Sequence, residues 1–89
     1  MDYYYQVKYF YYKYNSGNAD NGHYDNKISF NSLSEAKEFI NQIKNIIDNK
    51  KMNKEEPLTE IEDNLIPDGG FFTKYPELYK VTVEEIYEY

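Results

Sequence analysis

The chain has 89 residues, a mass of 10.7 kDa and a formal net charge of −6. This length suits a single domain with one small core. The absence of cysteine excludes disulfides and cysteine-ligated metal sites, and the lone His23 excludes sites that need two histidines. No apolar run reaches the roughly 18 residues of a membrane span, and the N-terminus does not resemble a signal peptide. We therefore expect no membrane contact and a cytoplasmic protein.

The charge is unevenly spread. Residues 1–54 hold eight lysines and six acidic residues, whereas residues 55–89 hold two lysines and ten acidic residues. Arginine, which provides the bidentate contacts to phosphate and guanine, is absent. The sequence therefore predicts no direct binding of nucleic acid, and its acidic third is either a solubility device or a surface for a basic partner. The candidate contact residues are Glu55, Glu56, Glu60, Glu62, Asp63, Glu84 and Glu88.

The first 30 residues predict a β-hairpin. Residues 2–14 are rich in Tyr, Phe and Val without a breaker, residues 15–22 form a dense Asn/Gly turn, and residues 23–30 alternate again. The better core face of the first strand carries no charge before Lys13. This face consists of Tyr3, Tyr5, Val7, Tyr9 and Tyr11.

A helix follows the hairpin. Ser32 and Glu35 match a capping box, and apolar residues then recur at three- and four-residue spacing over residues 33–49. Residues 50–70 predict an irregular acidic loop with a short helical turn near 58–66 and a turn at 68–70, and residues 78–89 predict a terminal strand. The expected fold is a single α+β domain over residues 1–89, in β-β-α-β order. Its three-stranded, mostly antiparallel sheet would carry one amphipathic helix, within 32–49, on one face. The expected core includes Phe39, Ile43, Ile46, Val81 and Val83.

Catalytic and metal-binding patterns are weak. None of the four serines lies in a nucleophile motif, His23 lies by the hairpin turn, and Gly69-Gly70 does not continue into a phosphate loop. The oxygens near residues 18–25 do not have the spacing of a calcium loop. The sequence predicts no catalytic residues, no metal and no cofactor.

The unusual feature is the second face of the first strand, which we name the aromatic strip and which carries Tyr4, Phe10, Tyr12 and Tyr14. It could contact a protein partner or a second copy, because Tyr is enriched at binding hot spots. Alternatively, Lys8, Lys27 and Lys80 cover the rings. Base stacking is opposed by the acidic charge.

These features favour a non-enzymatic acidic protein-interaction module. In size and charge the chain resembles inhibitors made by phages and mobile elements, including anti-CRISPR and anti-restriction proteins, although no motif identifies a family. That resemblance implies nucleic-acid mimicry against a basic nucleic-acid-binding protein. The alternatives are an assembly protein that forms a homodimer through its Tyr-rich sheet face or a strand edge, and a single-strand nucleic-acid binder.

Overall fold

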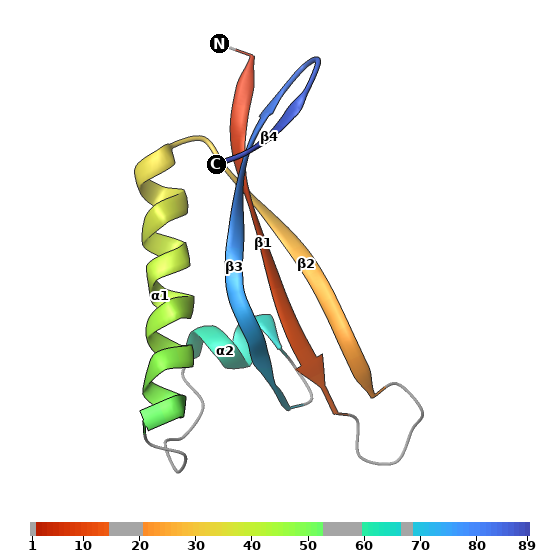
Figure 1. Cartoon of the computed structure of the whole chain (residues 1–89), viewed down its shortest axis with the longest axis vertical. Helices are drawn as coiled ribbons and strands as arrows, with labels where there is room; N and C mark the ends of the chain where they lie inside the picture. The colour runs from red at the N-terminus through yellow and green to blue at the C-terminus, as the bar shows by residue number, and fades with distance from the viewer. Residues whose placement is uncertain (1, 15–20, 53–59, 67–68) are drawn as a thin grey trace.

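The computed structural model describes residues 2–14, 21–52, 60–66 and 69–89 (Figure 1). The α+β class is confirmed. In chain order the elements of the described residues are β1 (Tyr3–Lys13), β2 (Gly22–Phe30), α1 (Leu33–Met52), α2 (Glu60–Leu65), β3 (Gly70–Thr82) and β4 (Ile86–Glu88).

Across these residues the sheet has four antiparallel strands in the order β2-β1-β3-β4, so the prediction of three strands is wrong. The predicted β-β-α-β order is also wrong, because a second helix and a fourth strand give β-β-α-α-β-β along the described residues. The predicted strand at 78–89 is in fact two strands, because the chain reverses at Val83 and Glu84. The backbone N–H of Thr82 donates to the carbonyl of Glu85 at 2.8 Å, and the Glu85 N–H donates to the Thr82 hydroxyl at 3.0 Å. A two-residue turn without Gly or Asn carries no sequence signal of a hairpin.

Strand β3 also begins earlier than predicted. Residues 70–77 contain Gly70 and Pro76, which break most strand patterns. Here Lys8 of β1 pairs with Glu77 and Phe10 pairs with Lys74, so Tyr75 and Pro76 together lie opposite a single β1 residue. This irregularity lets β3 carry a proline, because a bulged residue need not donate to the neighbouring strand.

Helices α1 and α2 lie on the same side of the sheet (Figure 1). The predicted core face of β1 is confirmed, since Tyr5, Val7 and Tyr9 are buried beneath the helices. Two adjoining clusters form the core. One contains Tyr9, Ile43, Ile46, Ile47, Ile66 and Phe72, and the other contains Tyr5, Val7 and Ala36.

The core prediction is confirmed for Ile43 and Ile46, which are buried, while Phe39 is half-buried and Val81 is buried on the other face of the sheet, outside both clusters. It was wrong for Val83, whose side chain is 83% exposed in the turn between β3 and β4. Because of the turn, Tyr87 and Tyr89 lie on the helix face, whereas Tyr79 and Val81 lie on the opposite face.

Helix α1 starts as predicted and ends three residues later than predicted. The Ser32 carbonyl accepts the Ala36 N–H at 3.1 Å, and the Ser32 hydroxyl accepts the Glu35 N–H at 3.3 Å. Helix α2 lies where the sequence predicts a short helical turn near residues 58–66, and Ile61, Leu65 and the following Ile66 pack against the core. These apolar residues, spaced by four and five positions, explain why a short helix forms there.

Candidate functional site

The sheet face turned away from α1 and α2, named here the open face, is the best candidate for a contact surface. The aromatic strip lies on it, and no helix of the described residues packs against it (Figure 1). Residues paired directly across neighbouring strands lie on the same face of the sheet. The pairing register therefore shows which residues of β2, β3 and β4 share the open face with the aromatic strip. These include His23, Asp25 and Lys27 of β2, Phe71, Lys74, Glu77, Tyr79 and Val81 of β3, and Ile86 and Glu88 of β4.

At one end of the open face the aromatic rings pack on each other. The Tyr12 ring stacks on Phe71 with centroids 5.5 Å apart and planes at 24°, and it meets Tyr14 at 5.4 Å and His23 at 5.1 Å edge-on. Such pairs stabilise one another. Tyr12 and Tyr14, predicted as partner contacts, therefore already have ring partners within the fold.

The centre of the open face is polar. Phe10 lies beneath two lysines, with the Lys74 Nζ 3.8 Å and the Lys8 Nζ 5.5 Å from its ring centroid. Lysine side chains therefore cover the Phe10 ring, as one alternative predicted. The lysines are Lys8 and Lys74, whereas the prediction named Lys8, Lys27 and Lys80. Lys8 also pairs with Asp25 at 3.4 Å, and Lys74 with Glu77 at 3.9 Å.

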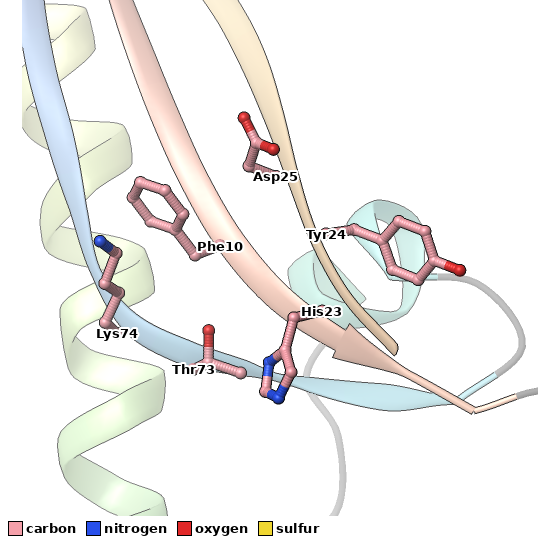
Figure 2. A pocket seen from close by; sticks show the side chains of 6 residues that line it. All are labelled: Phe10, His23, Tyr24, Asp25, Thr73 and Lys74. Atoms are coloured by element: carbon pink, nitrogen blue, oxygen red, sulfur yellow. The ribbon is translucent and has the colours of Figure 1, made fainter. Parts of the chain in front are cut away.

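A shallow hollow of about 290 Å³ lies beside Phe10. Figure 2 shows its lining: His23, Tyr24 and Asp25 from β2, with Thr73 and Lys74 from β3. The Asp25 carboxylate and the Lys74 amine both border this hollow, so opposite charges line it. The lining therefore carries no excess of positive or negative charge that would select a charged ligand.

The other end of the open face is the β3–β4 hairpin, and it differs from the rest. Tyr4, Val81 and Ile86 form a row across three strands. Ile86 is 65% exposed and Val83 83% exposed, and Glu84, Glu85 and Glu88 beside them are also exposed. We name Val83, Glu84, Glu85, Ile86 and Glu88 the acidic hairpin. It combines exposed aliphatic side chains with three carboxylates and no cation.

Tyr79 links the acidic hairpin to the centre of the face. Its hydroxyl donates to Glu77 Oε1 at 2.6 Å, and this hydrogen bond, with burial and the Glu77 charge, raises the pKa of Tyr79 to about 12. Tyr79 and Ile86 also border a second hollow, of about 200 Å³, with Gln6, Lys8 and Lys27. The surface at the hairpin end of the open face is therefore concave beside Ile86.

The acidic candidates do not form one surface. Glu60 and Asp63 are exposed on α2, whereas Glu84 and Glu88 lie on or beside β4 toward the opposite end of the molecule (Figure 1). Glu55 and Glu56 lie outside the described residues.

Glu62, predicted to point to solvent, is fully buried, with its Oε2 2.5 Å from Lys50 Nζ. The helical turn places it toward α1 instead. An intact fold therefore does not offer this carboxylate to a partner.

Sequence reasoning missed Phe71, Lys74, Val83 and Ile86 at this surface. Phe71 and Lys74 were missed because the Gly and Pro residues around them conceal β3. Val83 and Ile86 were missed because a continuous alternation over residues 78–89 assigned them to a regular strand. The exposed pair of glutamates between them, Glu84 and Glu85, was the available signal that the strand is interrupted.

Among the described residues no group of three or more His, Cys, Asp or Glu side chains is arranged to hold a metal ion. The described helices include none that is both long and apolar enough to cross a membrane. No protein-family model, curated protein or solved structure matches the chain.

Proposed function

We propose that the protein is a non-enzymatic binding module that contacts a basic protein partner through its acidic hairpin. The observation that carries this proposal is the exposure of Val83 and Ile86 beside three glutamates. Covering exposed aliphatic side chains with a partner removes apolar surface from water and so stabilises the complex. Carboxylates around these side chains favour a partner of positive charge. The hairpin thus provides both an apolar anchor and a charge preference.

The aromatic end of the open face is a weaker candidate. Its rings already contact one another, so covering them would bury less new apolar surface. The centre of the face carries internally paired charges, which a partner would have to desolvate. In the acidic hairpin Val83 and Ile86 are exposed, and no ion pair is formed by Glu84, Glu85 or Glu88 among the described residues, although Glu85 accepts a hydrogen bond from the Tyr87 hydroxyl.

The specific form of the proposal is inhibition of a nucleic-acid-binding protein. In this form, Glu84, Glu85 and Glu88 occupy positions that phosphates take in the partner's basic groove, while Val83 and Ile86 pack on its wall. Carboxylates attract the same lysine and arginine side chains that bind phosphate. The net charge of −6 adds a long-range attraction toward such a groove.

The test is quantitative capture from a lysate of the source organism with immobilised protein, followed by mass spectrometry. Four forms are compared: wild type, Val83→Ser/Ile86→Ser, Glu84→Gln/Glu88→Gln, and Glu60→Gln/Asp63→Asn. The last removes the same number of exposed charges at the other end of the molecule. A basic protein should be retained by the wild type and by the α2 control, and it should be lost from both hairpin variants.

The captured protein is then purified and its association kinetics are measured at two salt concentrations. Raised salt should slow association with the wild type, and this dependence should weaken in Glu84→Gln/Glu88→Gln. Competition with a DNA duplex tests the inhibitor form, because both would occupy one groove. Capture that is equal for all four forms would overturn the proposal.

A further inference from the structure

Strand β2 lies at an edge of the sheet. Within the described parts of the chain β2 pairs with β1 alone, and its other side borders none of the described strands or helices (Figure 1). The strand is nine residues long, and His23 to Lys27 are all exposed. An unpaired edge of this length can add a further strand.

The hydrogen-bond register shows which backbone groups point outward. Tyr14 donates its N–H to the Gly69 carbonyl, so even-numbered residues of β1 face β3 and odd-numbered ones face β2. The pairing of β1 with β2 then directs even-numbered residues of β2 inward. His23, Asp25, Lys27 and Ser29 therefore point their N–H and C=O groups to the open edge. In agreement, the Lys27 N–H donates to the Asn26 side chain at 2.8 Å.

We propose that two copies of this chain pair antiparallel through β2, with Asn26 opposite Asn26 at the twofold axis. In this register Asp25 lies opposite Lys27 of the second copy, and the reverse pair forms by symmetry. Both residues have outward-pointing backbone groups, so each such pair exchanges two backbone hydrogen bonds. On the helix face, Tyr24 lies opposite Ile28 of the second copy.

Charge selects this register over its neighbours. A shift that keeps the hydrogen bonds places Asp25 opposite Asp25 or Lys27 opposite Lys27, and like charges directly opposite destabilise a strand pair. A shift that pairs an odd with an even residue misaligns the hydrogen bonds. The sequence Asp25-Asn26-Lys27 is thus self-complementary around its central residue. On pairing, the Lys27 N–H gives up its hydrogen bond to the Asn26 side chain and donates instead to a backbone carbonyl of the second copy.

The rest of the fold permits this dimer. Helix α1 packs mainly against β3, on the far side of β1 from the free edge. A twofold axis perpendicular to the sheet keeps both open faces on one side, so the two acidic hairpins remain exposed. The inference does not depend on the proposed function, because it concerns the other edge of the sheet and needs no partner.

Sedimentation equilibrium of the full chain tests the dimer. The wild type should associate, and Asp25→Lys and Lys27→Asp should each weaken self-association by about tenfold or more, since both cross-pairs become repulsive. An equimolar mixture of the two variants should associate as tightly as the wild type, because each Lys then faces an Asp. The double swap Asp25→Lys/Lys27→Asp should do the same alone. Glu38→Lys, on exposed α1 surface, changes the net charge in the same direction and by the same amount as Asp25→Lys and should have no effect.

A second variant tests the edge without changing charge. Ser29→Pro removes an outward N–H while leaving the bonds to β1 intact, so it should weaken the dimer with an unchanged circular dichroism spectrum. A wild type that stays monomeric at millimolar concentration overturns the inference. So does self-association that the single charge variants leave unchanged. Neither result affects the hairpin proposal, which the capture experiment tests separately.

Discussion

Lys50 and Glu62 form an ion pair that joins the end of α1 to α2, with Lys50 Nζ 2.5 Å from Glu62 Oε2. The Glu62 side chain is fully buried, whereas that of Lys50 is 27% exposed. A buried carboxylate requires a compensating charge, so the position of α2 depends on this lysine. The pair therefore connects the least regular part of the chain to its most regular helix.

Replacing Lys50 should be costly. Lys50→Met removes the lysine that pairs with a buried carboxylate, and we expect a loss of about 2–3 kcal/mol in the free energy of unfolding. Lys50→Met/Glu62→Leu should recover most of this loss, because neither charge is then buried alone. Urea denaturation measures both variants. Lys44→Met, at an exposed site on the same helix, is the control and should cost less than about 1 kcal/mol. Equal losses at Lys44 and Lys50 would contradict the role of the pair.

The core prediction contrasts two aliphatic residues. Ile43 is fully buried and Val83 is 83% exposed. Ile43→Ala should lower the free energy of unfolding by about 2–5 kcal/mol, because it leaves a cavity between α1 and the sheet. Val83→Ala should change it by less than about 0.5 kcal/mol. Chemical denaturation of both variants checks this, and comparable losses would mean that the turn packs against something in solution.

Several elements were predictable because their residues satisfy local rules. The helix start at Ser32, the faces of β1 and the hairpin with β2 follow from capping and alternation. The hidden elements violate such rules: Pro76 lies in a strand, Val83 and Glu84 form a turn without Gly or Asn, and Glu62 is a buried acid. Pro76 and Glu62 depend on tertiary partners that sequence spacing does not reveal, and the turn depends on Thr82–Glu85 hydrogen bonds that have no distinctive sequence signal. The sequence leaves open whether the acidic third is a contact surface or a solubility device, and the structure places its described candidate residues partly on α2 and partly in the hairpin.

Gly70 is a position where only glycine fits. Its φ is +141°, and a Cβ there would lie 2.2 Å from the Tyr12 carbonyl oxygen and 2.7 Å from the Ile66 side chain. Gly70→Ala should therefore lower the free energy of unfolding by at least about 2 kcal/mol through backbone strain and displacement of β1. Gly22→Ala, whose Cβ would meet only the Tyr24 ring at ordinary contact distance, is the matched control. If thermal melts of the two variants coincide, the close approach at Gly70 does not exist in solution.

Tyr79 should make stability depend on alkaline pH. Its pKa is raised from 10.0 to about 12, chiefly by the hydrogen bond to Glu77. The unfolded chain therefore loses this proton at lower pH than the folded chain. The stability that Tyr79 contributes is complete below pH 10 and declines as pH rises toward 12. Comparing urea denaturation of wild type and Tyr79→Phe across this range isolates the effect, since the remaining tyrosines are common to both proteins. Their difference in unfolding free energy should shrink as pH rises, and Glu77→Gln should return the Tyr79 titration, followed by tyrosinate absorbance, toward 10. A difference that stays constant over the range would show that the Tyr79–Glu77 hydrogen bond does not persist in solution.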